Sequence, residues 1–357
     1  LFPYTTLFRS LKPPSNVTVG TIAPGKFKRG YVQSWNFFIE RRLPAEIILS
    51  AGYVGNHFVN YFNGRNINAA PLGGGSASQP LAKYARYLAT YQFAGDLSSN
   101  YHSLQVSLNR RTASGLFLQG SYTWSRAMAY ADDNTYGNQL QFNCPPSPAM
   151  PEGCMRLNYS PTSFDRTHML KMAFVYDLPF GAGKRMGTSS RAVNAVIGGW
   201  RLNGMFTGLT GAPLSIGQGS SVLNTPGTSV KPTVIAPPKY IKERAQFGNY
   251  SGIYWFDPST FVPNLTPLSL GNMPRRVSWL RGPGIVQLDA SIFRTFSYRE
   301  RWTLEVRGEA MNALNMTHFG DPSTSCTVVG NACLGSFGQV NSAFGQRIVQ
   351  LGAAVRF

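Results

Sequence analysis

The sequence is poor in charged residues, and acidic residues are the scarcest of them. Only 13% of the 357 residues are Asp, Glu, Lys or Arg, whereas soluble domains usually have about a quarter. No apolar run approaches the ~18 residues that a membrane helix needs. A helical membrane protein is therefore excluded. If the chain spans a membrane, it must do so with strands closed into a barrel.

The few charges are mostly positive, with 33 Lys and Arg against 15 Asp and Glu and a net charge of +18. The basic residues are scattered and form no blocks, which argues against nucleic acid as a partner. An Arg-rich lumen and loops beside anionic lipid headgroups explain the charge equally well. One hypothesis for the function is nevertheless a soluble basic β protein that binds nucleic acid. It predicts solubility without detergent and a steep salt dependence of binding.

Cysteine is also scarce, with four residues in the chain. Cys144 lies close to Cys154 in the sequence, and Cys326 lies close to Cys333. Neither pair has the spacing of a metal site. Short local pairs in polar loops predict two disulfides and an oxidising compartment, with the pairing left open.

The sequence contains no pattern that indicates an enzyme, a cofactor site or a metal site. The Gly181–Lys184 stretch lacks the flanking residues of a phosphate loop and predicts a turn. The Asp132-Asp133-Asn134 run lacks the spacing and glycine of a calcium loop. No serine lies in a nucleophile elbow. The histidines occur singly, at positions that share no metal-type spacing: His57, His102, His168 and His318.

What the sequence does have is an alternation of apolar and polar residues with a period of two, which is typical of strands with one apolar face. Residues 347–357 show it most clearly, because every second residue from Val349 to Phe357 is apolar. We predict that this is the last strand of a barrel, with Val355 and Phe357 as its C-terminal signal. Eight more strands are expected at 31–41, 45–55, 102–111, 116–126, 166–178, 200–216, 285–295 and 302–311.

The connections between these strands alternate between short and long. Long polar loops are predicted at 56–100, 127–165 and 217–284. Outer-membrane barrels have short periplasmic turns and long extracellular loops, so the alternation favours an all-β, antiparallel transmembrane β-barrel.

Two groups of residues follow from the strand parity. Four tryptophans on the apolar parity near strand ends are expected to form the interfacial aromatic girdle: Trp35, Trp124, Trp200 and Trp302. Four charged residues share the polar parity of neighbouring strands. Paired carboxylates can do acid–base chemistry, but a solvated ladder of charges in the lumen is the favoured interpretation: Asp289, Glu305, Arg307 and Glu309.

Several motifs, weak singly but ordered along the chain, carry a resemblance to a known family. They include Tyr122-Thr123-Trp124-Ser125, the WFDP run at 255–258, the LRGPG run at 280–284 and the EAMNALN run at 309–315. In these stretches the sequence resembles TonB-dependent outer-membrane receptors, more narrowly the Oar-like group. Met311 replaces the usual aromatic residue, and Met316-Thr317 replaces a more typical His-Pro.

Nine is an odd number of strands, whereas bacterial single-chain barrels usually have an even number. We therefore expect the C-terminal part of a larger barrel, of about 22 strands. The resemblance implies a plug domain and a TonB contact in a missing N-terminal part. Residues 1–10 are predicted to be a sequencing-adapter artefact, and 11–357 a partial barrel domain with long extracellular loops.

The expected location is the bacterial outer membrane. The expected partners are its lipid and lipopolysaccharide, the barrel-assembly machinery and the TonB complex. The expected function is uptake of a scarce ligand, namely a siderophore, an oligosaccharide or a peptide. The alternative function is a passive porin or a surface adhesin.

Overall fold

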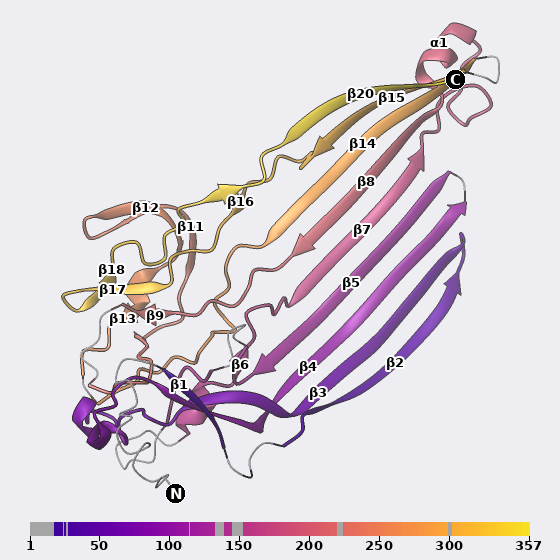
Figure 1. Cartoon of the computed structure of the whole chain (residues 1–357). Helices are drawn as coiled ribbons and strands as arrows, with labels where there is room; N and C mark the ends of the chain where they lie inside the picture. The colour runs from indigo at the N-terminus through magenta and orange to yellow at the C-terminus, as the bar shows by residue number, and fades with distance from the viewer. Residues whose placement is uncertain are drawn as a thin grey trace, which may run out of the picture.

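A computed structural model describes residues 18–23, 25, 28–113, 115–132, 139–144, 153–219, 224–266, 268–298 and 302–357. Residues 1–10, predicted to be an artefact, lie outside the described residues. Nine long strands form one curved antiparallel sheet (Figure 1). In sheet order they are β2 (Tyr31–Leu43), β3 (Ile47–Asn66), β4 (Thr90–Ala113), β5 (Leu116–Ala129), β7 (His168–Asp177), β8 (Trp200–Leu209), β14 (Ile285–Tyr298), β15 (Trp302–Met311) and β20 (Ile348–Arg356).

The number and place of these strands confirm the period-two prediction. The sheet is open in the described residues, because β2 and β20 form its two edges and do not pair with each other. The strand predicted to close a barrel is therefore an edge strand here. Two small strands attach to the sheet at one end: β1 (Val19–Ile22) pairs with β4, and β6 (Ser160–Pro161) pairs with β5.

The register places the apolar parity of all nine strands on one face of the sheet. Residues directly opposite each other in antiparallel strands point to the same side. Tyr53 pairs with Leu104, Leu104 with Trp124 and Trp124 with His168. The same relation continues to Val349 and Leu351 in β20 through Ala310 and Gly308. The sheet thus has one continuous apolar face and one continuous polar face.

The two ends of the sheet differ. At the turn end, β2 and β3 are joined by a tight turn in which Ala45 and Glu46 have φ values of 63° and 58°. The longer link between β7 and β8 carries a short helix, α1 (Arg191–Ile197), which the sequence analysis did not predict. The long connections gather at the opposite end, which we call the loop end (Figure 1).

Strands β3 and β4 extend much further toward the loop end than predicted, and they take up most of the loop expected at 56–100. Their pairing continues beyond Gly55 as far as the pair formed by Asn66 and Tyr91. The register shifts between Phe58 and Phe62 at a β-bulge, which changes the parity of the strand. The expected alternation breaks at that point, although the strand does not end.

The predicted loop at 217–284 is largely folded, and the strand predicted at 200–216 ends at Leu209. At Gly211 the chain passes close to the backbone of Gly282, where a Cβ atom would clash.

The small elements of the loop end are β9 (Gly217–Gln218), β10 (Thr233–Val234), β11 (Tyr240–Phe247), β12 (Tyr250–Phe256), β13 (Phe261–Val262), β16 (His318–Phe319), β17 (Ser325–Val329), β18 (Ala332–Leu334) and β19 (Ala343–Phe344), with the 3-10 turns η1 (Ser76–Ser78), η2 (Ala82–Tyr84), η3 (Cys154–Leu157) and η4 (Pro258–Thr260).

The loop end has its own hydrophobic core. Phe256, Phe261 and Phe337 are fully buried and contact one another with ring centroids 5.2 to 5.5 Å apart. Leu214, Leu280 and both cysteines of the Cys326–Cys333 disulfide belong to the same cluster. The burial of these apolar side chains stabilises the fold of the loop end, in addition to the pairing of the strands.

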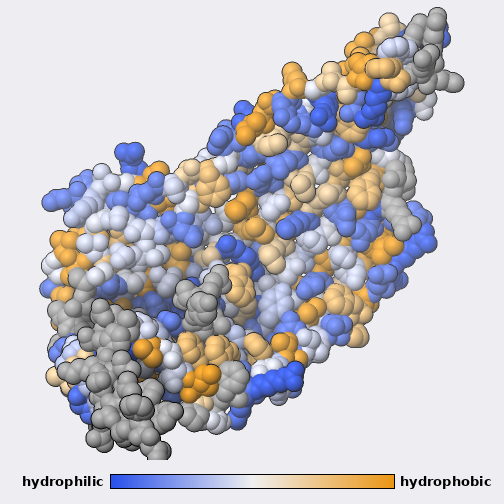
Figure 2. All heavy atoms as spheres, viewed as in Figure 1, coloured by the Kyte–Doolittle hydropathy of each residue, from blue (hydrophilic) through white to orange (hydrophobic). Residues whose placement is uncertain are grey.

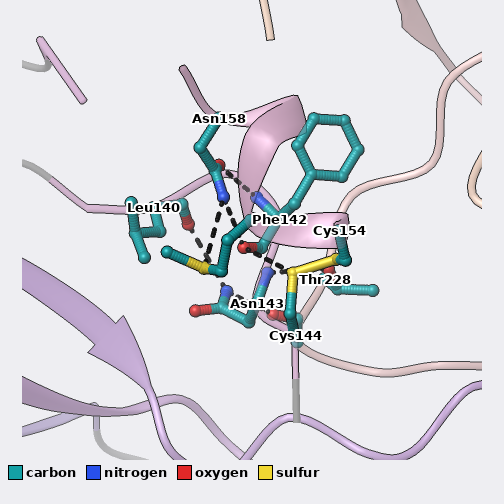
Figure 3. Close-up of a disulfide and its surroundings, with 9 residues drawn as sticks. Leu140, Phe142, Asn143, Cys144, Cys154, Asn158 and Thr228 are labelled. Atoms are coloured by element: carbon teal, nitrogen blue, oxygen red, sulfur yellow. Dashed lines mark hydrogen bonds between the residues drawn. A yellow bond between two sulfur atoms is a disulfide. The ribbon is translucent and has the colours of Figure 1, made fainter. Parts of the chain in front are cut away.

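A second, smaller core lies around the Cys144–Cys154 disulfide (Figure 3). Phe142 is fully buried beside it, and its backbone N–H donates to Asn158 Oδ1 over 2.9 Å. Both disulfides join cysteines that are close in sequence, and both lie in loop-end segments.

Candidate functional site

A polar cavity of about 650 Å³ lies between the loop-end segments. Its walls come from the far ends of β3 and β4, from residues 139–143 and from segments that follow β8 and precede β14. Side chains that line it include Asn66, Tyr91, Gln141, Ser215, Ser229 and Arg276. Amides, hydroxyls and guanidinium groups of this kind bind polar ligands by hydrogen bonds.

A buried ion cluster holds one wall of the cavity in place. Asp132 forms ion pairs with both Arg275 and Arg276. Arg275 also donates from Nε to the carbonyl of Asn158 over 3.2 Å and from an Nη to the carbonyl of Ala129 over 3.1 Å. Its donors are thus used to tie the segment before β14 to the end of β5. Arg275 is a structural residue of the cavity wall.

The opposite wall is held by amide hydrogen bonds. Asn143 donates from Nδ2 to the carbonyl of Gly227 over 2.8 Å, and its backbone N–H donates to Thr228 Oγ1 over 2.9 Å (Figure 3). Its own Oδ1 accepts from the backbone N–H of Asn66 over 2.8 Å. These bonds join three connections that are far apart in the sequence.

Gln141 differs from its neighbours in the wall. Its Oε1 is buried, and within the described part of the chain it has no hydrogen-bond donor. A buried carbonyl oxygen without a donor costs about 1–3 kcal/mol. Gln141 lines the cavity, and its unpaired oxygen makes it a candidate contact for a bound molecule.

Lys231 lies beside the cavity and is completely buried. Its Nζ donates to the carbonyl of Ile216 over 2.5 Å and to Ser215 Oγ over 3.3 Å. Burial, with the nearby Arg276, lowers the pKa of Lys231 to about 8. Burial and Arg276 also lower the pKa of Arg275 to about 9, so both groups are cationic at pH 7. The region around the cavity is therefore electropositive.

The depressed pKa of Lys231 gives a testable pH dependence. Between about pH 8 and pH 10.5 the unfolded state binds the Lys231 proton more strongly than the folded state, so stability rises with pH in this window. At 1.36 kcal/mol per pKa unit the rise is about 3 kcal/mol. Denaturant titrations of the full-length protein across this window should show it. The Lys231→Met variant should lack this part of the slope, and an unchanged slope would contradict the assignment.

The four tryptophans predicted as a girdle all lie on the apolar face. Trp35 and Trp124 are near the loop end, and Trp200 and Trp302 are at the turn end, where the Trp302 and Phe357 rings lie 5.3 Å apart between centroids and are tilted by 32°. Val355 shares this face and pairs with Leu304. The roles of these residues as aromatic girdle and as C-terminal signal stay predictions.

The predicted lumen charges lie on the polar face, on neighbouring strands. Arg307 Nε is 3.8 Å from Glu309 Oε1. Asp289 accepts hydrogen bonds of 2.8 Å from Gln287 Nε2 and from the backbone N–H of Asn312, and Glu305 pairs in register with Thr295. The solvated ladder of charges in the lumen stays a prediction.

The single histidines make different kinds of contact. His102 Nδ1 lies 2.6 Å from Tyr53 Oη, and His168 Nδ1 lies 2.8 Å from Tyr122 Oη. His57 bonds to Asn100, and His318 bonds to a backbone carbonyl. The described residues contain no group of three or more His, Cys, Asp or Glu side chains that could hold a metal ion. Of the weak acidic motif, Asp132 forms the ion cluster, while Asp133 and Asn134 lie outside the described residues.

Sequence reasoning missed the cavity residues Gln141, Arg275 and Arg276 and the buried Lys231 beside them. The adjacent arginines follow Pro274 and precede Val277, and nothing in that pattern links them to Asp132. Within the described part of the chain, no helix has the length and apolar character that a membrane crossing requires.

Comparison with known protein families decides the class of this fold. Residues 2–350 match the family model described as an outer membrane beta barrel domain. The chain belongs to this family. The barrel wall therefore lies in the outer membrane, with its apolar face toward lipid and its polar face toward the lumen. Short turns face the periplasm and long loops face the outside, which places the cavity on the extracellular side.

The barrel also resembles solved structures, each at low identity. The outer membrane transporter YddB from Escherichia coli has a TM-score of 0.46 and 9% identity, over 95% of this chain and 34% of that one. The siderophore receptor PiuA from Acinetobacter baumannii has a TM-score of 0.41 and 9% identity, over 91% and 28%. The chain thus spans about a third of the length of these proteins. A comparison with curated proteins found no match.

Proposed function

We propose that the chain is the C-terminal part of the barrel of a TonB-dependent transporter, of the Oar-like group, that takes up a scarce ligand. The observation that carries the proposal is the folded loop end, with its own core and a polar cavity on the extracellular side. A passive pore needs no such structure at its mouth. The sequence motifs that resemble TonB-dependent receptors support the same function.

In the proposed mechanism the cavity captures the ligand before it crosses the barrel. Gln141 Oε1 accepts a hydrogen bond from a ligand N–H or O–H, and Arg276 adds positive charge at the wall. A ligand with hydroxyl, amide or anionic groups fits this lining. A siderophore, an oligosaccharide and a peptide all carry such groups. The ligand would then pass the charged groups of the lumen when a plug, supplied by a segment outside this chain, moves.

Energy dependence separates a transporter from a porin or an adhesin. Cells that express the complete gene would be given radiolabelled probes: a ferric hydroxamate, a linear oligosaccharide and a short peptide. Uptake of one probe that stops when a protonophore is added, or when TonB is deleted, is expected. Uptake that persists under both treatments would identify a passive porin. Sequencing upstream of residue 11 supplies a second test, because a transporter requires a plug domain and a TonB-contact segment there.

The cavity has its own test. The Gln141→Leu variant keeps the size of the side chain and removes the buried acceptor. Its affinity for the transported probe, measured by calorimetry on the full-length protein in detergent, should fall about tenfold, which corresponds to ~1.4 kcal/mol. Gln350→Leu, on the polar face of β20 and far from the cavity, is the matched control and should leave binding unchanged. Equal affinities for both variants would exclude Gln141 as a ligand contact.

A further inference from the structure

The link between β7 and β8 leaves apolar side chains exposed at the periplasmic end of the barrel. Val193 and Val196 on α1 are 44% and 69% exposed, and Met186 before the helix is 53% exposed. The hydropathy surface shows hydrophobic groups at the end of the sheet where α1 lies (Figure 2). A cluster of exposed apolar groups of this kind usually marks a binding surface.

The link is nevertheless compactly folded. Ser190 caps α1 by accepting a hydrogen bond from the backbone N–H of Val193, and Asn194 Oδ1 accepts from the backbone N–H of Thr188 over 3.0 Å. Successive residues of a helix are rotated by about 100°, so Val193 and Val196 lie on one arc and Asn194 lies outside it. Asn194 bonds to the link itself, and the apolar arc is left exposed.

Two hydrogen bonds fix α1 on the lipid-facing side of the sheet. Trp200 donates from Nε1 to the carbonyl of Val196 over 3.0 Å, and Arg294 donates to the same carbonyl over 2.8 Å. Trp200 and Arg294 are direct partners in the register, and both belong to the outward apolar face. The exposed apolar arc is therefore continuous with the lipid-facing surface of the barrel.

The charges within the link have one sign. Residues 178–199 contain Lys184, Arg185 and Arg191 and no Asp or Glu. All three cations are exposed, and Arg294 adds a fourth next to the helix. A short helix with one apolar side and a basic surround fits the boundary between acyl chains and anionic headgroups.

We propose that residues 179–199 form an interfacial anchor in which α1 inserts its apolar arc into the phospholipid leaflet facing the periplasm. The occupant of the surface is anionic glycerophospholipid. Val193, Val196 and Met186 lie among the upper acyl groups, and the cations contact headgroup phosphates. The anchor fixes the depth of the barrel on the side of β7 and β8. The proposal rests on the outer-membrane location of the barrel and is independent of the transport function.

Spin labels on the full-length protein test the anchor. All four native cysteines are in disulfides, so a label on Val196→Cys is selective. In vesicles of phosphatidylethanolamine and phosphatidylglycerol, this label should be several-fold more accessible to oxygen than to a water-soluble nickel complex. Ala195→Cys, one residue away and outside the apolar arc, is the matched control and should show the reverse preference. Ile292→Cys on the outward face of β14 is the lipid reference.

Two outcomes would overturn the proposal. A label at Val196 that is as open to the nickel complex as the label at Ala195 would place α1 in water. A label shielded from both reagents would indicate a protein partner. The Lys184→Gln/Arg185→Gln variant tests the contribution of the cations. In this variant the accessibility of the Val196 label should no longer depend on the phosphatidylglycerol content of the vesicles. A dependence on phosphatidylglycerol equal to that of the parent protein would show that these cations do not contribute to the anchor.

Discussion

Replacement of Phe206 by arginine is expected to destabilise the barrel by about 2–4 kcal/mol, the cost of a cationic side chain on the lipid face near the bilayer midplane. Phe206 lies in the middle of β8 and pairs with Met172 and Leu288 on the apolar face. Its neighbour Met205 points to the lumen, where it pairs with Asp289. Met205→Arg places the same charge in water beside a carboxylate, so its effect should be close to zero.

The pair of variants tests the assignment of the two faces with one change of chemistry. Urea titrations of the full-length protein in lipid vesicles, followed by the heat-dependent gel mobility of folded barrels, measure both free energies of unfolding. Equal losses for the two variants would show that lipid contacts both sides of β8. A larger loss for Met205→Arg would reverse the assignment of lumen and exterior.

Asp165→Ala should cost about 3–5 kcal/mol, because it leaves the largely buried Arg281 guanidinium without its carboxylate partner and a buried backbone N–H without its acceptor. Asp165 is 2% exposed. Its carboxylate accepts from Arg281 over 2.5 Å and from the backbone N–H of Ala127 over 2.7 Å. Arg281 also donates to the carbonyl of Gly211 over 3.1 Å. The Asp165 carboxylate therefore joins β5 to the segment before β14, and Arg281 links this pair to the segment after β8.

An exposed ion pair in the same chain is the control for Asp165. Arg201 Nε lies 2.6 Å from Asp177 Oδ1, but these side chains are 47% and 32% exposed. Asp177→Ala should therefore cost no more than about 1 kcal/mol. Hydrogen exchange and limited proteolysis should show opening of the loop end in Asp165→Ala and little change in Asp177→Ala. Similar protection in both variants would mean that the hydrophobic cores alone hold the loop end.

The sheet could be predicted from the sequence because each strand carries its own evidence. A residue such as Leu351 faces lipid because of its parity within β20, whatever its partners are, and one strand is enough to read that pattern. The same rule placed the predicted tryptophans and charges on opposite faces. It failed beyond Gly55, where the bulge near Tyr61 changes the parity of the strand and where buried positions are polar, as at Asn63 and Asn66.

The cavity could not be predicted because its residues meet only in three dimensions. Asp132 and Arg276 are 144 positions apart, and neither lies in a pattern that anticipates the other. The loop-end core depends equally on distant pairs, such as Phe256 with Phe337. Strands of two residues, such as β10 and β13, are too short to show a period at all. The strands, which depend on the pattern within one segment, could be predicted. The cavity and the loop-end core, which depend on contacts between distant segments, could not.

The two disulfides have a consequence for how the protein matures. Cys144 and Cys154 are 10 positions apart, and Cys326 and Cys333 are 7 apart. Rings this small close at a low entropic cost in an unordered chain. Neither thiol pair needs the sheet to bring it together. Both disulfides can therefore form in the oxidising periplasm while the polypeptide is still unfolded. The loop end would then carry its disulfides before the strands enter the bilayer.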